Sequence, residues 1–259
     1  MTYIESLVLG FIQGATEFLP ISSSGHLVIA QRLFGLHEPQ LVFDILLHFA
    51  TLFSVVLFFW KDILKLRLKE YVSMAIATVP AVFVGLLFKD QIEALFASGA
   101  TLAIEFLITA GCNFAIHAFL KKERPTTQTI KPSQAFIVGI AQAAAIAPAI
   151  SRSGLTVLAG LFTKLDRETA FRFSFLISIP AILGANMLGM LDVVKDGVAL
   201  PPFGQVVGGM LGAALVGILS LRMLRYMIRH AQFALFGWYC VILAGLVLMW
   251  QTQLIPGWL

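Results

Sequence analysis

Residues 13–29, QGATEFLPISSSGHLVI, place a polar cluster inside a hydrophobic chain. Apolar sequence lies on both sides of the cluster, and Pro20 and three serines stand in its middle. A proline inside a helix removes a backbone hydrogen bond and clashes with the preceding turn. The stretch therefore predicts that residues 1–35 form two half-length helices with a polar tip, and not one continuous span.

A second stretch of this kind, APAISRSG at residues 147–154, interrupts the apolar region 132–163. A shift of 129 residues aligns the two regions with eight identities in the nineteen positions from residue 10 to residue 28. The identical pairs include Ser22 with Ser151, Ser24 with Ser153 and Gly25 with Gly154. We therefore expect one membrane domain, residues 1–259, with duplicated halves of about 1–120 and 121–259.

The composition indicates a membrane protein. The 259 residues are 59% hydrophobic and only 12% charged, with a mean hydropathy of +0.90, whereas soluble domains have about 25% charged residues. The apolar runs are continuous, unlike the alternating strands of barrels, so an all-α polytopic membrane protein is expected. Residues 1–5 lack the basic n-region of a cleavable signal peptide, so we expect no cleavage.

Six apolar segments are long enough to serve as transmembrane helices. They cover approximately residues 42–60, 68–88, 101–120, 168–190, 204–224 and 234–251.

Basic residues predict the orientation, because cytoplasmic connections are enriched in Lys and Arg. Connections 61–69, 121–131, 164–167 and 222–230 hold 4, 4, 2 and 3 of them, which is 13 of the 18 in the chain. These connections should face the cytoplasm, and loop 191–203 and both termini should face outward. The pI near 9.2 follows from this one-sided charge and requires no nucleic-acid partner.

The same count predicts how the interrupted regions enter the membrane. Region 132–163 lies between two cytoplasmic connections, so it must enter and leave from the cytoplasmic side, whereas residues 1–35 dip in from outside. Two re-entrant helix hairpins from opposite faces form an inverted-topology repeat, an arrangement that places polar sites near the membrane midplane.

The two tips carry groups that suit a phosphate. An arginine within the membrane is costly and usually faces a partner or substrate. The planar guanidinium of Arg152 suits phosphate oxygens, and Glu17 can balance its charge in the empty site. Helix starts add backbone N–H groups, although any one serine can equally be an N-cap. The candidates are Gln13, Glu17, Ser22, Ser23, Ser24, Gly25 and His26 in the first tip and Ser151, Arg152, Ser153 and Thr156 in the second.

Other polar residues also lie in apolar segments. Asp44 and His48 share a helix face at i, i+4, which suits either a supporting role at the site or a satisfied pair. Glu168 and Arg172 have the same spacing and are expected to form a structural ion pair. Glu105 and Asn113 lie along one span.

At these tips the sequence resembles the undecaprenyl pyrophosphate phosphatase family of bacterial membranes, also called bacitracin resistance proteins. The family's first motif matches Gln13 and Glu17, followed by the Ser-Ser-x-Gly-His run within residues 22–26. Its second motif, Pro-Gly-x-Ser-Arg-Ser-x-x-Thr, matches residues 148–156, except that Ala149 replaces the glycine. Alanine tolerates a positive φ poorly, so this position raises a question about the turn. The resemblance covers essentially the whole chain.

The resemblance implies hydrolysis of undecaprenyl pyrophosphate to undecaprenyl phosphate and inorganic phosphate. This reaction recycles the carrier lipid for peptidoglycan synthesis and gives bacitracin resistance. It implies a polyprenyl pyrophosphate lipid and the bilayer as partners, in the bacterial cytoplasmic (inner) membrane, with a site open to the periplasmic side. It also implies a divalent cation, Mg²⁺ or Ca²⁺, with Glu17 and Gln13 as candidate ligands.

Several mechanisms remain open from the sequence. Ser23 is the candidate nucleophile, with Glu17 as its base or as a cation ligand. His26 is a proton donor or an alternative nucleophile, and a metal-activated water is the rival to both. A transporter or flippase of polyprenyl phosphates is the non-enzymatic alternative, because the inverted repeat alone would suit it. A type 2 phosphatidic acid phosphatase is excluded, because Leu158 stands where its nucleophilic histidine would be.

Overall fold

The computed structural model describes residues 1–36, 40–123 and 125–252. These residues form an all-α protein, and six of their helices are long and apolar enough to cross a membrane, which confirms the predicted class and number of spans. The six are α3 (Leu41–Phe58), α5 (Leu68–Leu87), α7 (Leu102–Lys121), α10 (Arg167–Lys195), α11 (Phe203–Arg229) and α12 (Ala234–Gln251).

Helices α10 and α11 are longer than predicted. The expected outer loop 191–203 shrinks to residues 196–202, and Asp192 lies within α10, where its carboxylate accepts a hydrogen bond of 2.7 Å from Lys89. Lys89 begins α6 (Lys89–Ser98). This short helix and α4 (Trp60–Ile63) were not predicted from the sequence. Both are too short to have been recognised as spans.

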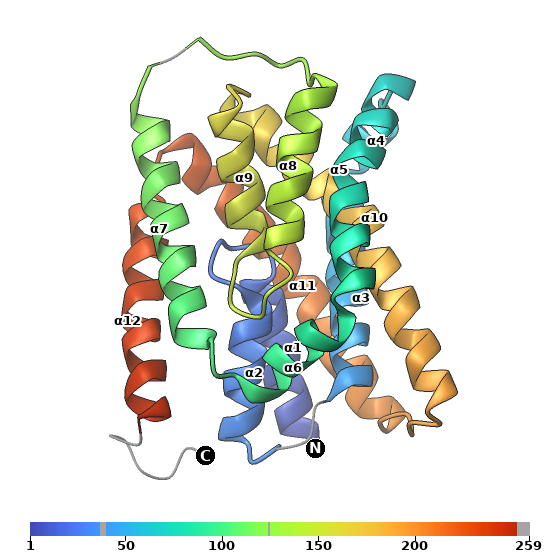
Figure 1. Ribbon diagram of the computed structural model, residues 1–259. Helices are drawn as coiled ribbons and strands as arrows, with labels where there is room; N and C mark the ends of the chain where they lie inside the picture. Colours follow the sequence, from blue (N-terminus) through green and yellow to red (C-terminus); the bar gives the residue numbers. More distant parts are fainter. Residues whose placement is uncertain (37–39, 124, 253–259) are drawn as a thin grey trace.

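The two interrupted regions form helix pairs with the expected break. The first pair is α1 (Tyr3–Thr16) and α2 (Ser23–Leu33), and the second is α8 (Pro132–Ala144) and α9 (Arg152–Phe162). Figure 1 shows the pairs entering the bundle from opposite ends, with the connecting tips meeting in its interior. The bounds of α2, shifted by 129 residues, coincide with those of α9. The second helix of each pair therefore begins and ends at equivalent positions under this shift.

Equivalent serines cap α2 and α9. The hydroxyl of Ser22 accepts from the N–H of Gly25 at 3.5 Å, and that of Ser151 accepts from the N–H of Gly154 at 3.1 Å. Both pairs coincide under the 129-residue shift. Serine at an N-cap satisfies one of the N–H groups that a helix start leaves unpaired. The Ser-x-x-Gly spacing thus fixes where each second half-helix begins.

Small residues bring the first half of each hairpin against a long helix of the other repeat. A Cβ atom on Gly10 of α1 would overlap the backbone oxygen of Gly209 in α11, and one on Gly139 of α8 would overlap that of Ala77 in α5. Glycine allows this close backbone approach between helices in a membrane. The matched contacts hold both tips at the centre of the bundle.

The end of the bundle opposite residue 1 is held by ion pairs between helices. Glu168 and Arg172 do not pair with each other, contrary to the prediction. Glu168 of α10 pairs with Arg225 and Arg229 of α11, and Arg172 pairs with Glu70 of α5 at 3.2 Å. The prediction rested on the i, i+4 spacing within one helix. The actual partners lie on other helices, which local spacing does not reveal.

Candidate functional site at the meeting of the two tips

The two tips contact each other directly. Ser22 Oγ donates to the carbonyl oxygen of Pro148 at 2.8 Å, and Ser153 Oγ donates to that of Leu19 at 3.4 Å. A Cβ atom on Gly25 would lie 3.0 Å from that of Ala149, so glycine is needed where the tips touch. Each hairpin therefore helps to hold the other, and their polar side chains share one buried space.

Ser22 occupies a strained backbone conformation at this junction. Its φ is 68°, a region that L residues other than glycine rarely adopt. The Ser22 hydroxyl makes both the cap to Gly25 and the contact to Pro148, and these two hydrogen bonds help to hold the strained conformation. Such strain costs on the order of 1–3 kcal/mol and concentrates at functional sites. Ala149, in contrast, is not among the positive-φ residues, so alanine fits the second turn without strain.

Glu17 is the centre of the site. Its Oε1 accepts from Arg152 Nη2 at 2.6 Å, which joins the first tip to the second. Its Oε2 accepts from Ser23 Oγ at 2.6 Å and from Gln13 Nε2 at 3.1 Å, and lies 3.6 Å from His48 Nε2. The side chain of Glu17 is only 6% exposed. A buried carboxylate bonded to a serine hydroxyl has the geometry of a base beside its nucleophile.

The two terminal nitrogens of the Arg152 guanidinium differ in their contacts. Nη2 donates to Glu17, whereas Nη1 is buried and has no hydrogen-bond partner among the described residues. An unpaired charged donor is costly inside a protein. Because the guanidinium can bind phosphate oxygens through two parallel N–H groups, an incoming phosphate would satisfy Nη1.

The remaining hydroxyls of the second tip serve mainly to hold the backbone. Ser151 caps α9 and lies 3.2 Å from Ser153 through the two hydroxyls. Thr156 donates to the carbonyl of Arg152 at 2.7 Å and lies 2.5 Å from Ser174 Oγ. In the first tip, Ser24 is half-buried and its hydroxyl has no partner among the described residues.

The structure separates the two histidines of this region. His26 Nδ1 lies 2.6 Å from the carbonyl of Ser22, which can only accept, so this nitrogen carries the proton. His26 Nε2 then accepts from Tyr239 Oη at 2.7 Å. The structure therefore directs His26 toward α12, and His48 of α3 is the imidazole beside Glu17.

Sequence reasoning missed Tyr239 and gave His48 only a supporting role. The i, i+4 spacing of Asp44 and His48 was a weak signal. In the structure the Asp44 carboxylate accepts from Gln31 at 2.8 Å, while His48 Nδ1 contacts the Asp44 carbonyl at 2.7 Å. Tyr239 carried no local signal, because its contact with His26 joins residues 213 positions apart.

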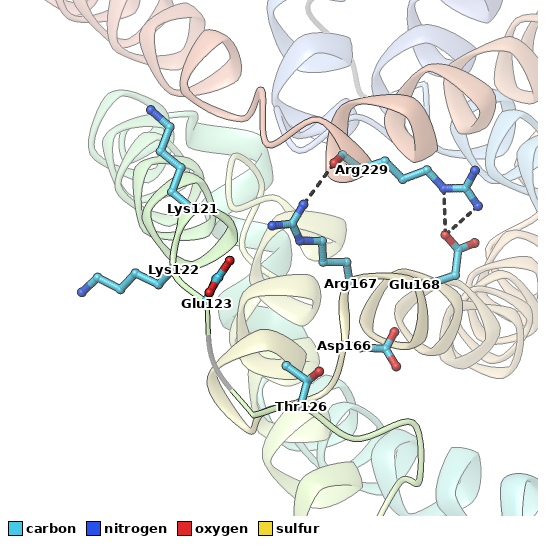
Figure 2. Close-up of a pocket in the computed structure, with 8 residues that line it drawn as sticks. All are labelled: Lys121, Lys122, Glu123, Thr126, Asp166, Arg167, Glu168 and Arg229. Atoms are coloured by element: carbon cyan, nitrogen blue, oxygen red, sulfur yellow. Dashed lines mark hydrogen bonds and ion pairs between the residues drawn. The ribbon is translucent and has the colours of Figure 1, made fainter.

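A separate cavity of about 600 Å³ lies at the end of the bundle away from residue 1 (Figure 2). Figure 2 shows that Arg167 donates to the backbone carbonyl of Arg229 and that Arg229 pairs with Glu168. Arg167 also donates to the backbone carbonyl of Leu120. None of the predicted site residues is among the described residues that line it. The tips are therefore the stronger candidate site.

The fold and the site define a polytopic all-α membrane protein with a buried serine–carboxylate–arginine cluster between two helix hairpins. A family model described as bacitracin resistance protein BacA matches residues 6–246. The chain belongs to this family.

Curated relatives match over nearly their whole length. An undecaprenyl-diphosphatase of Carboxydothermus hydrogenoformans is 41% identical over 97% of this chain and 98% of its own length. Undecaprenyl-diphosphatase 4 of Bacillus cereus is 42% identical over 92% and 94% of the two chains. An undecaprenyl-diphosphatase of Moorella thermoacetica is 38% identical over 95% and 97%.

Proposed function

We propose that this protein is an undecaprenyl-diphosphatase, which hydrolyses undecaprenyl pyrophosphate to undecaprenyl phosphate and inorganic phosphate. The observation that carries the proposal is Glu17, whose two oxygens accept from Ser23 and Arg152 at 2.6 Å each. This unit combines a nucleophile, a base and a phosphate ligand. The names of the relatives supply the substrate, and the apolar outer surface of the helices suits its polyprenyl tail.

The residues suit a two-step reaction through a phosphoserine. Ser23 Oγ attacks the terminal phosphorus and its proton passes to Glu17 Oε2, while the bond from that phosphorus to the bridging oxygen breaks and undecaprenyl phosphate leaves. Glu17 gives this proton to the departing undecaprenyl phosphate and is again a carboxylate. Water then attacks the phosphoserine and gives a proton to Glu17, which passes it to Ser23 Oγ as the bond from phosphorus to Oγ breaks and inorganic phosphate leaves. Arg152 stabilises the charge on the transferred phosphoryl group, which is the main requirement of such a transfer.

A divalent cation fits the donor atoms of this site. Gln13 Oε1 is buried and has no hydrogen-bond partner in the described part of the chain, and it belongs to the same side chain that contacts Glu17. Mg²⁺ typically binds one or two protein oxygens together with substrate phosphates. We propose Gln13 and Glu17 as the residues that would hold Mg²⁺ or Ca²⁺. When bound, the cation would neutralise part of the pyrophosphate charge.

We further propose that the site opens to the periplasmic side of the bacterial cytoplasmic membrane. The connections rich in Lys and Arg, such as the one after α7, lie at the end of the bundle opposite residue 1 (Figure 1). Because basic connections remain in the cytoplasm, the first hairpin enters from the outer face. Recycling the carrier lipid there would support peptidoglycan synthesis and bacitracin resistance.

Phosphate release in detergent tests the activity. The purified protein should convert a polyprenyl pyrophosphate into one equivalent each of the lipid monophosphate and inorganic phosphate. A flippase or transporter needs two membrane faces and would leave the pyrophosphate intact in a micelle. Bound but uncleaved substrate would therefore contradict the proposal and favour a carrier.

A further inference from the structure

Three polar residues on one face of α7 contact the backbone of both tips. Glu105, Thr109 and Asn113 follow each other at intervals of four residues, so their side chains form one stripe along the helix. All three are buried, with exposed fractions of 4%, 1% and 0%. We refer to them as the α7 stripe.

Two residues of the α7 stripe form hydrogen bonds with the backbone immediately before Arg152. Glu105 Oε2 accepts from the N–H of Ala149 at 2.6 Å. Thr109 Oγ1 donates to the carbonyl of Ala149 at 2.8 Å and accepts from the N–H of Ser151 at 3.0 Å. The N–H and the carbonyl of Ala149 and the N–H of Ser151 are thus all hydrogen-bonded to α7. Arg152 is the next residue in the chain.

The same stripe also reaches the first tip. Asn113 Nδ2 donates to the carbonyl of Pro20 at 2.6 Å and to that of Thr109 at 3.0 Å. Pro20 lies midway between Glu17 and Ser23. Helix α7 therefore bonds both to the backbone between Glu17 and Ser23 in the first tip and to the backbone just before Arg152 in the second tip.

We propose that the α7 stripe consists of positioning residues, which set the separation of Arg152 from Glu17 and Ser23 in the phosphatase reaction. This inference rests on the proposed function. Its physical basis is that phosphoryl transfer depends on alignment, and a misplacement of about 1 Å can cost about a hundredfold in rate. Thr109 is the central member, because a single hydroxyl both donates to and accepts from the second tip.

Thr109→Val tests this role, because valine keeps the branched shape and removes the hydroxyl. In detergent, with a short-chain polyprenyl pyrophosphate as substrate, kcat should fall about a hundredfold, while KM should change less than about threefold. Thr109→Ser restores the hydroxyl, and its kcat should return to within about threefold of wild type. A purely structural residue would not show this split and rescue at an unchanged melting temperature.

Thr78→Val is the matched control, because Thr78 is a half-buried threonine whose hydroxyl donates only within its own helix, to the carbonyl of Met74. It should keep kcat within about twofold. A folded Thr109→Val with near-normal kcat would overturn the proposal, as would an equal loss in Thr78→Val or a failed rescue by serine.

Folding is checked by the melting temperature of each variant. If Thr109→Val does not fold, Thr109→Cys is measured in its place, because a thiol has similar size and bonds weakly. If neither variant folds, the stripe is a folding element and the positioning role is rejected. An inactive wild type would instead overturn the proposed function itself, whereas an active wild type with an unimpaired Thr109→Val overturns only the inference.

Discussion

Arg152 shows how a charged side chain can be kept at the centre of a membrane protein. Nη2 is paired with Glu17, and Nη1 is buried with no hydrogen-bond partner among the residues that the structure describes. Lysine would keep the charge but could not supply the second, parallel N–H group. We expect Arg152→Lys to reduce phosphate release by about a hundredfold or more, the scale of losing one donor to a transition state.

The control for this substitution is Arg172→Lys, which alters an arginine paired with Glu70 away from the tips. It should retain near-normal turnover. If Arg152→Lys also turned over substrate at the normal rate in the same steady-state assay, Arg152 would have no part in the reaction.

At the scale of single residues, the sequence predicted the groups that lie within one tip or carry an unusual cost. Glu17, Ser23 and Arg152 stood out because a carboxylate, a serine run and an arginine are rare in apolar surroundings. The contacts of His48 and Tyr239 could not be predicted, because each approaches its partner from a separate transmembrane helix. For Ser151 and Thr156 the residue type was informative, but whether its hydroxyl faces substrate or backbone depends on the folded geometry.

At the scale of elements, the packing of α1 against α11 positions Glu17, which lies at the C-terminal end of α1. Gly10→Ala would force a methyl group into the backbone of Gly209 and should push the two helices apart. Overpacking of this kind costs about 1–3 kcal/mol. We expect a lower melting temperature in detergent together with reduced turnover, since α1 carries Gln13 and leads to Glu17.

Gly85→Ala provides the comparison, because a Cβ atom at Gly85 in α5 would meet nothing within 4 Å. That variant should melt at or slightly above the wild-type temperature, since alanine favours a helix. Equal melting temperatures for Gly10→Ala and wild type would show that the two helices are not held at the described separation.

The elements themselves were largely predictable, because length, apolarity and helix-breaking residues are local properties. The 129-residue shift even placed the start of α9 from that of α2. The extra turns of α10 and α11 were missed, because Asp192 and Arg225 counted as connection residues, whereas both form ion pairs at helix ends. Interhelical pairing makes a charged residue acceptable there.

At the scale of the whole molecule, the charge distribution predicts one orientation in the membrane. A cysteine introduced at Thr126, in the connection after α7, should react only with a reagent that reaches the cytoplasm. One introduced at Asp196, after α10, should react with an impermeant reagent added outside intact cells. The native Cys112 and Cys240 are both buried, so the parent protein should give a weak background. Labelling of Thr126→Cys from outside would reverse the proposed topology.

The arrangement of hairpins from opposite ends could be inferred from sequence because the parity of the spans leaves one solution. The mutual support of the two tips could not be inferred, since it depends on contacts such as that between Ser22 and Pro148. These contacts make the site a property of both repeats together. A substitution in either tip should therefore change the geometry of the same site.

The central claim is that Ser23, held 2.6 Å from Glu17, attacks the pyrophosphate. The most direct measurement is the turnover of Ser23→Ala in detergent beside Ser73→Ala, which removes a buried serine hydroxyl that donates to its own helix at the carbonyl of Lys69. The account predicts a loss of about a thousandfold or more for Ser23→Ala with substrate binding retained, and little change for Ser73→Ala. A loss of only a few-fold in Ser23→Ala would contradict it and indicate attack by water.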